Sequence, residues 1–319
     1  MPNSTTHAAK SFARYCLNEG HALIARSKIL SQGYLTMLGG LMRLTPKFPF
    51  KANIVASIVQ CRWPQMNFGS RTVEVCPGSE IEIFPYVGEQ DFKALLTESL
   101  NYELDVFRLL KDRLKQYDAI LEIGANVGLY SCFFANYRPN KQVPLYCFEP
   151  SKTAFCRLVR NMDLADQTNV YLVPAAVSTQ SGLVRFFEPV EHLSNGSIIE
   201  NFAACFSSHI ISSWVPCVGP NEITQLLSLS HAPLLKIDVE GSEPEVITAL
   251  AEFIKIKLPD IIMEVLLPYA ENLNNISVIL ENYNLYLITP DGLIEKTAFE
   301  AHPLHRDYFL SPKNRSVSA

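Results

Sequence analysis

One stretch, residues 118–151 (DAILEIGANVGLYSCFFANYRPNKQVPLYCFEPS), constrains the fold more than any other part of the chain. Its pattern predicts a short apolar strand over 118–123, a glycine-containing loop, a helix to about residue 137 and a second buried strand over 143–148. A strand, helix and strand in this order form a βαβ unit with a right-handed crossover. In open sheets built from such units, ligands bind beyond the carboxyl ends of the strands. We therefore expect an α/β fold with a ligand site at the glycine loop.

The residues of the loop select among the cofactors that such a site takes. Gly124 and Gly128 allow a tight turn and a close approach of the backbone to a ligand. Glu149, 25 residues after Gly124, stands where a carboxylate accepts hydrogen bonds from ribose hydroxyls. A dinucleotide fingerprint needs a glycine where this chain has Asn126, and the carboxylate of Glu122 before the loop suits a cationic ligand better than a diphosphate. S-adenosylmethionine, which has a sulfonium, an ammonium and a ribose but no phosphate, is the predicted cofactor; an ordinary crossover with glycines used for packing is the alternative.

The rest of the chain supplies elements for one large α/β domain. Residues 71–86 alternate around a Pro-Gly pair and predict a hairpin, and residues 89–116 predict a helical lead-in. Further strands are expected over 169–173, 233–238, 259–265, 285–289 and 306–310, with helices that include 242–254 and 269–283. This alternation predicts a doubly wound, Rossmann-like sheet with an antiparallel edge strand.

Two local features refine this prediction. Ser242 and Glu245 form a capping-box pattern at the start of the helix expected over 242–254. Residues 188–220, which include His192 and His209, are the least regular part of the chain, and such segments usually hold specificity loops.

Charge is distributed unevenly along the 319 residues. The formal net charge of −5 argues against a nucleic-acid binder of the basic-groove kind. Residues 1–62 contain eight Lys and Arg but one acid, which gives +7, so the remainder carries −12. The predicted organisation is a basic, mainly helical N-terminal extension over 1–70 and a larger α/β domain over 71–319. The second part consists of a lead-in, 71–117, and a Rossmann-like core, 118–319.

The basic extension is open to two interpretations. Its longest apolar run, near residues 34–44, is interrupted by two glycines and Arg43 and is too short to span a bilayer, and no secretory signal pattern precedes it. A peripheral contact of residues 1–62 with a membrane or an acidic partner is one interpretation, and a solvated helical cap is the other. Because none of the eight cysteines forms Cys-x-x-Cys, a reducing, cytoplasmic environment without structural zinc is expected.

A second informative stretch, LLKIDVEGSE, covers residues 234–243. Lys236 and Asp238 share one face of the expected strand, and Glu240 follows just beyond its end. Such groups are costly to bury without partners, so a ligand, a metal or mutual pairing must compensate them. One interpretation is a structural Lys–carboxylate network. The functional interpretation is that Asp238 faces the methionine part of the cofactor while Lys236 or Glu240 faces the acceptor.

These stretches together resemble one family. The sequences EIGANVG, FEPS, NVYLVPAAVS, LLKIDVEGSEPEVI and PDIIMEV look like those of the FkbM family of S-adenosylmethionine-dependent methyltransferases, over roughly residues 95–310. The resemblance implies the seven-stranded class I methyltransferase fold and, commonly, methyl transfer to a hydroxyl. It also implies acceptors such as sugars, polyketides or other secondary metabolites.

The resemblance assigns cofactor-binding residues by position. The first cofactor motif covers Glu122, Gly124, Ala125, Asn126 and Gly128, the ribose-binding acid is Glu149 with Pro150 beside the adenine, the adenine edge falls at Ala175-Ala176, and the family signature contains Asp238 and Glu240. Tyr102-Glu103 loosely resembles a Tyr-Glu pair found before the first strand, which would help to close the site. The basic extension lies outside the resemblance and leaves the acceptor open.

Methyl transfer from a sulfonium is an in-line displacement, in which a neutral hydroxyl must lose its proton as it attacks. The candidate catalytic residues are Lys236, Asp238 and Glu240, and His192 and His209 are further candidates for the base. A divalent ion held by Asp238, Glu240 and Glu264 would be another way to acidify the hydroxyl, and the sequence leaves this metal open.

The predicted function is therefore an S-adenosylmethionine-dependent O-methyltransferase acting on a small-molecule or glycan acceptor. The alternative is a non-catalytic binding module on the same fold that docks through its basic N-terminus. A nicotinamide-dependent oxidoreductase is disfavoured because the middle glycine of the fingerprint is missing.

Overall fold

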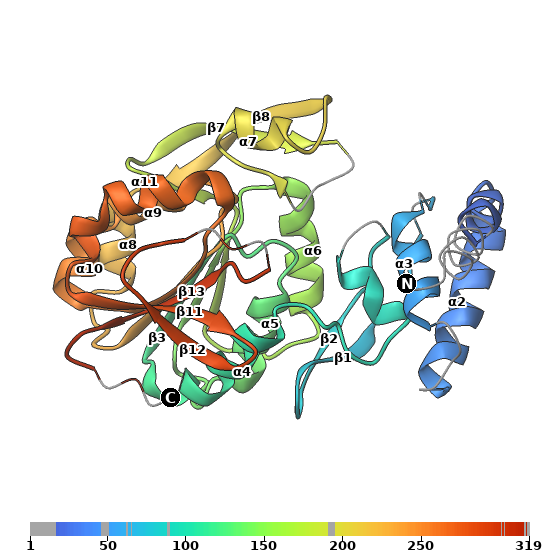
Figure 1. The fold of residues 1–319 in the computed structure, drawn as a ribbon, viewed down its shortest axis with the longest axis horizontal. Helices are drawn as coiled ribbons and strands as arrows, with labels where there is room; N and C mark the ends of the chain where they lie inside the picture. The colour runs from blue at the N-terminus through green and yellow to red at the C-terminus, as the bar shows by residue number, and fades with distance from the viewer. Residues whose placement is uncertain are drawn as a thin grey trace, which may run out of the picture. The chain divides into compact units, whose positions relative to one another are not determined.

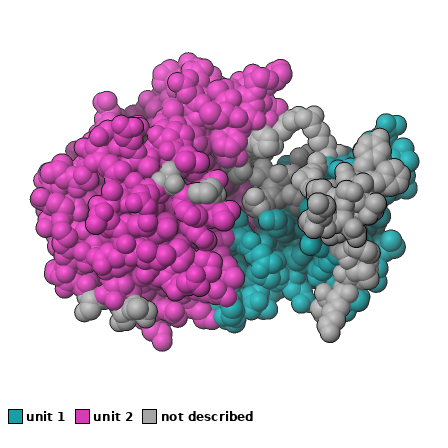
Figure 2. Space-filling model, in the orientation of Figure 1, with its two compact units in different colours: residues 1–102 teal, residues 103–319 magenta. Residues whose placement is uncertain are grey.

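The computed structural model describes residues 17–45, 51–61, 63–64, 66–87, 90–190, 195–300, 302, 304–315 and 317. Two compact units make up the chain, Met1–Tyr102 and Glu103–Ala319 (Figure 2). The candidate base His192 lies outside the described residues.

The first unit contains helices, followed by a β-hairpin and a 3₁₀ helix. Its elements are a helix over 17–24, α2 (Lys28–Leu44), α3 (Lys51–Gln60), β1 (Arg71–Cys76), β2 (Ser79–Ile83) and η1 (Gln90–Leu95). Helix α2 begins at Ser27, whose side chain accepts a hydrogen bond from Leu30 N. The predicted hairpin is confirmed, because β1 and β2 pair in antiparallel and Gly78 turns between them with a φ of 69°. Within the described residues, no helix is long and apolar enough to cross a membrane.

The second unit is built on an eight-stranded sheet with the order β12-β11-β13-β10-β9-β3-β4-β5 (Figure 1). The strands are β3 (Ala119–Ile123), β4 (Leu145–Phe148), β5 (Val170–Val173), β9 (Pro233–Ile237), β10 (Asp260–Glu264), β11 (Tyr283–Thr289), β12 (Gly292–Lys296) and β13 (Asp307–Pro312). The five strands from β5 to β10 are parallel, whereas β13 runs antiparallel to both of its neighbours and β12 is the antiparallel edge strand. The predicted doubly wound sheet is therefore confirmed, with β12 as an additional strand.

Helices cover both faces of this sheet, with α8 to α11 on one side and α4 to α6 on the other (Figure 1). They are α4 (Leu104–Arg113), η2 (Leu114–Gln116), α5 (Leu129–Tyr137), α6 (Lys152–Met162), α8 (Pro220–Leu226), α9 (Glu243–Ala249), α10 (Ala251–Lys257), η4 (Leu267–Tyr269), α11 (Ala270–Asn275) and η5 (Ser277–Leu280). Leu121 and Ile123 of β3 share a core with Val246 and Ile247 of α9, while Glu122 between them contacts α5. All five residues of β3 are consequently buried, as expected for a parallel strand covered on both faces.

The order of the strands determines where a ligand binds. The chain moves outward from β3 to β4 and β5, and it then returns to place β9 on the other side of β3. The direction of winding thus reverses between β3 and β9, and open α/β sheets bind their ligands at such a switch point.

A small second sheet corrects the sequence-based description of residues 188–220. It consists of β6 (Ala176–Val177), β7 (Gly182–Pro189) and the nine-residue β8 (Ile210–Val218), with α7 (Glu200–Ala204) between β7 and β8. The prediction of irregularity was wrong for β8. This strand exposes four consecutive residues, Ile211 to Trp214, so its sequence lacks the apolar–polar alternation of a half-buried strand.

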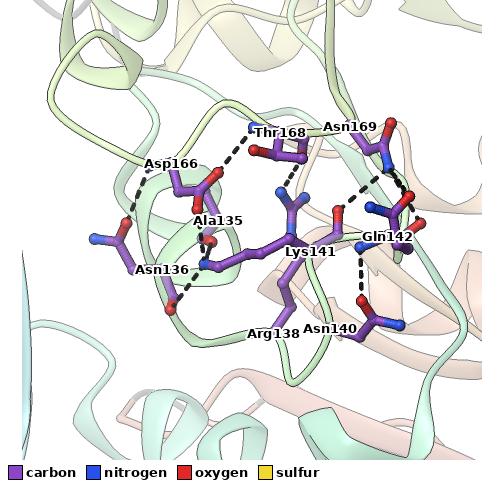
Figure 3. A network of polar contacts seen from close by, with 9 residues as sticks. All are labelled: Ala135, Asn136, Arg138, Asn140, Lys141, Gln142, Asp166, Thr168 and Asn169. Atoms are coloured by element: carbon purple, nitrogen blue, oxygen red, sulfur yellow. Dashed lines mark hydrogen bonds and ion pairs between the residues drawn. The ribbon is translucent and has the colours of Figure 1, made fainter.

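The far end of α5 is fixed by a polar network (Figure 3). Lys141 Nζ donates to Ala135 O at 2.6 Å and lies 3.4 Å from Asp166 Oδ2, so it binds the last turn of α5 and the loop before β5 together. Arg138, which follows the helix, donates to Thr168 O in the same loop. This network fixes the C-terminus of α5. The glycine loop leads into the N-terminus of the same helix, so the loop is connected to a firmly anchored element.

Candidate active site

The glycine loop between β3 and α5 lies at the switch point of the sheet. Gly124 and Gly128 adopt positive φ angles of 85° and 89°, and Asn126 adopts 50°. A Cβ atom added at Gly124 would lie 1.7 Å from Asp238 O, a distance that no pair of atoms tolerates. Only glycine at this position allows the loops that follow β3 and β9 to approach so closely. The buried Ala125 lies between these turns.

Glu149, at the end of β4, is held by two backbone donors. Asn126 N donates to Oε2 and Ser151 N donates to Oε1, both at 2.7 Å. Burial raises the pKa of Glu149 to about 7, against the lowering effect of these two hydrogen bonds. The carboxylate thus bridges the glycine loop and the start of α6, and the half-buried Pro150 follows it. The carboxylate lies beside the glycine loop, and its ribose-binding role stays a prediction.

Glu122 lies beneath the glycine loop. Its side chain is 1 % exposed, and Ser131 Oγ of α5 donates to its Oε2 at 2.6 Å. Burial raises the pKa of Glu122 to about 7, which the nearby Lys236 counteracts in part. The structure therefore turns this carboxylate toward α5 and gives it a supporting place under the loop.

Lys236 joins two acidic residues from different elements. Its Nζ donates to Asp238 Oδ2 at 3.0 Å and lies 4.3 Å from the centroid of the Tyr130 ring, whose hydroxyl donates to Glu103 Oε2 at 2.5 Å. Burial alone would lower the pKa of Lys236, but Asp238, Glu103 and Glu122 outweigh it and raise that pKa above its ordinary value. Lys236 is thus cationic at neutral pH, so it cannot act as a base and instead orients Asp238.

Carboxyl groups gather around this pair at the carboxyl ends of β9 and β10. The carboxyl groups of this cluster are those of Glu103, Asp238, Glu240, Glu243, Glu264 and Asp307. Burial, and then repulsion within the cluster, raises the pKa of Glu240 to about 10, that of Glu264 to about 8 and that of Asp307 well above its usual range. Arg306 Nη1 lies 3.7 Å from Glu264 Oε1, and its charge lowers the pKa of Glu264 by less than burial and repulsion raise it.

The chemistry of the cluster tests the predicted cofactor. A site rich in half-buried carboxyl groups stabilises a cationic ligand and repels a diphosphate. The sulfonium and ammonium of S-adenosylmethionine fit this charge, and its ribose hydroxyls fit Glu149. In the part of the chain that the structure describes, no three His, Cys, Asp or Glu side chains are arranged to hold a metal ion. The divalent ion suggested for Asp238, Glu240 and Glu264 therefore gains no support from the geometry.

Glu243 is a residue of this site that sequence reasoning missed. Its Oε1 accepts hydrogen bonds from Val239 N at 3.1 Å and Gly241 N at 3.3 Å, so it shapes the turn that presents Glu240. Its Oε2 is buried without a hydrogen-bond partner among the described residues, and burial raises the pKa of Glu243 to about 7. Glu243 is part of the sequence VEGSE, and its place in that motif was the signal that could have identified it as a site residue.

The capping box predicted at this helix is absent, and the single helix expected over 242–254 is divided into two. Ser242 makes no side-chain cap bond, and Glu245 Oε1 instead accepts from Ser178 Oγ at 2.6 Å. The segment divides near Leu250 into α9 and α10. In place of a local capping box, Glu245 bonds to Ser178 and Glu243 accepts hydrogen bonds from the loop before the helix.

The remaining predicted site residues lie in different parts of the structure. His209 is exposed and contacts the neighbouring Ser207 and Ser208, so its contacts do not connect it to the carboxyl cluster. Ala176 is buried in β6, where it pairs with Cys217 of β8. Tyr102 is the last residue of the first unit, while Glu103 begins the second. Ser197 Oγ donates to Glu240 O at 2.8 Å, which connects the segment between β7 and α7 to the loop that follows β9.

Comparison with known proteins decides the family. The methyltransferase FkbM domain matches residues 122–287, which is 166 of 319 residues and thus just over half of the chain. The chain belongs to this family. Membership confirms the resemblance noted in the sequence, together with the prediction of a domain that uses S-adenosylmethionine and is enzymatic.

Two curated relatives are similar over part of their length. Hexuronic acid methyltransferase AglP of Haloferax volcanii is 27 % identical over 155 residues, which are 47 % of this chain and 57 % of the relative. 2-O-methyltransferase NoeI of Sinorhizobium fredii is 30 % identical over 166 residues, which are 47 % of this chain and 63 % of the relative. The chain thus spans less than two thirds of either relative.

Solved structures of methyltransferases are also similar. Methyltransferase FkbM from Methylobacillus flagellatus is 15 % identical with a TM-score of 0.38, covering 61 % of this chain and 44 % of its own. A SAM-dependent methyltransferase from Agrobacterium tumefaciens is 11 % identical with a TM-score of 0.41, covering 79 % of this chain and 73 % of its own.

Proposed function

We propose that this protein transfers the methyl group of S-adenosylmethionine to a hydroxyl of a sugar-like acceptor. The observation that carries the proposal is the Lys236–Asp238 pair, which lies within a cluster of carboxyl groups at the switch point, where the backbone of Asp238 approaches Gly124 of the glycine loop. A sugar acceptor is supported by the relatives, whose names specify a hexuronic acid and a 2-O position. Catalysis is assigned to the second unit, and the small-molecule acceptor could equally be a glycan.

The residues of the site would divide the work of binding. Glu149 would receive the ribose hydroxyls, the glycine loop would surround the nucleoside, and Asp238, oriented by Lys236, would face the cationic methionine end. When bound, the cofactor supplies a methyl group activated toward displacement by its sulfonium. Because displacement is in line, the protein contributes chiefly by holding the acceptor oxygen in position.

We assign the general base to Glu240. In the unliganded protein its carboxyl retains a proton at neutral pH, because burial and repulsion by Asp238, Glu264 and Glu243 raise its pKa to about 10. A cationic ligand in the cluster lowers the pKa of neighbouring carboxyl groups. Glu240 would thus lose its proton when the cofactor enters and could then take the proton of the acceptor hydroxyl. The bond from Ser197 to its backbone fixes the loop that carries it.

The test uses Glu240→Gln with Glu240→Asp as the matched variant. Methyl transfer from radiolabelled S-adenosylmethionine would be measured with hexuronic acids and neutral hexosides as acceptors. Glu240→Gln should lose about 10²–10⁴-fold in turnover, the contribution of a general base, with S-adenosylhomocysteine affinity retained. Glu240→Asp should recover part of that rate, with a shifted pH profile.

Two results would contradict this assignment. Wild-type turnover in Glu240→Gln would remove Glu240 as the base. Cofactor binding without transfer to any hydroxyl acceptor would instead favour the non-catalytic binding module.

A further inference from the structure

One face of α2 is apolar and exposed to solvent. Its large side chains and their exposed fractions are Ile29 (84 %), Leu30 (62 %), Met37 (67 %), Leu41 (47 %) and Leu44 (86 %). At about 100° per residue, these side chains and two exposed glycines, Gly33 and Gly40, occupy one arc of about 120°. The buried residues Leu35, Leu38 and Met42 lie on the opposite side of the helix.

This arc contains no charged residue along the whole length of the helix. The polar positions of α2 that remain exposed, among them Lys28, Gln32 and Thr36, fall outside it. A helix with a second apolar face usually has a second apolar environment, because contiguous exposed patches of this kind mark sites of interaction. The arc is therefore a separate surface from the one with which α2 packs into its own unit.

The charge of the surroundings indicates what covers the arc. Residues 1–62 carry +7, and Arg26 and Lys28 are exposed at the start of α2. Arg43, at the other end, is already bonded to the carbonyl groups of Ala94, Thr97 and Thr72. An apolar helix face within a segment of net positive charge is the composition of helices that lie in the interface of an anionic membrane.

We propose that α2 lies flat on an anionic membrane surface with this arc inserted among the lipids. The 17-residue helix is about 26 Å long and too short to span a bilayer with its flanks, which suits an in-plane position. A second copy of this chain would cover an apolar arc equally well, but it would bring a second segment with a charge of +7 close to the first, and two such segments repel. This proposal concerns where the protein acts and does not depend on the proposed acceptor.

The experiment measures flotation of the full chain with vesicles. One set of vesicles contains phosphatidylcholine with about a third anionic phosphatidylserine, and the other contains phosphatidylcholine alone. The test variant, Leu30→Glu/Met37→Glu/Leu44→Glu, changes only exposed side chains of the arc. The matched control, Leu229→Glu/Ile256→Glu/Val278→Glu, places the same three charges on exposed apolar residues of the second unit, which are 90 %, 74 % and 67 % exposed.

The wild type and the control should float with the anionic vesicles, and the α2 triple variant should lose at least about tenfold of the bound fraction. Binding should weaken when serine lipid is omitted or when salt is raised. Circular dichroism should show the same unfolding temperature for all three proteins, because every altered side chain is exposed. Equal flotation of the α2 triple variant, or no flotation of the wild type, would overturn the proposal. Self-association that disappears in the α2 triple variant, without vesicle binding by the wild type, would also overturn it in favour of a dimer.

Discussion

Replacing Gly124 by alanine tests the close approach on which the site is built. The added Cβ meets the backbone oxygen of Asp238 at 1.7 Å, and a backbone atom cannot move aside as a flexible side chain can. The φ of 85° adds a conformational penalty of about 1–2 kcal/mol for any residue with a Cβ atom. Overpacking of a rigid contact costs about 1–3 kcal/mol more. The expected loss in the free energy of unfolding is therefore about 2–5 kcal/mol.

The matched control is Gly292→Ala in the turn between β11 and β12. Gly292 also has a positive φ, 111°, but a Cβ added there meets nothing within 4 Å. It should therefore cost only the conformational penalty of about 1–2 kcal/mol. Urea unfolding measures both variants, and calorimetry with S-adenosylhomocysteine measures the site. The reasoning is refuted if Gly124→Ala is as stable as Gly292→Ala and binds the ligand with wild-type affinity.

Two further predictions concern stability. The carboxyl groups of Glu122, Glu149 and Glu243 have pKa values raised from 4.5 to about 7, so the folded protein holds protons that the unfolded chain releases. The stabilising effect of these protons is complete below about pH 4.5 and is lost as the pH rises through 7. The unfolding temperature of the unliganded protein should therefore fall from pH 5 to pH 8, and it should fall less in Glu149→Gln. A flat or rising profile for the wild type would contradict this prediction. Asp260→Ala should destabilise the protein by about 3–5 kcal/mol in urea unfolding, because the fully buried Asp260 accepts hydrogen bonds from Tyr117, Ser311 and Arg315; a loss below about 1 kcal/mol would show that these donors find other partners.

The sequence was sufficient for the local parts of the site. The glycine loop, Glu149 and the Lys236–Asp238 pair follow from spacing, because a strand, a tight turn and the end of the next strand are specified by neighbouring residues. The structure places all of them at one edge of the sheet. The parallel core strands were predictable for the same reason, since each is a short apolar run.

Contacts between distant segments were not predictable in this way. The insertion of β13 between β10 and β11 places Asp307 opposite Glu264, and no local pattern indicates that pairing. Glu245 does not form the predicted cap and instead accepts a hydrogen bond from Ser178, which lies 67 residues away in the chain. Strand β8 was missed because an exposed strand shows no alternation of apolar and polar residues.

Calorimetric titration of the full chain with S-adenosylhomocysteine tests the central claim most directly. The account predicts binding in the micromolar range, about −8 kcal/mol, that is lost in Glu149→Ala while the unfolding transition stays cooperative. Absence of binding to the folded wild type, or wild-type affinity in Glu149→Ala, would contradict the assignment of this edge of the sheet as the cofactor site.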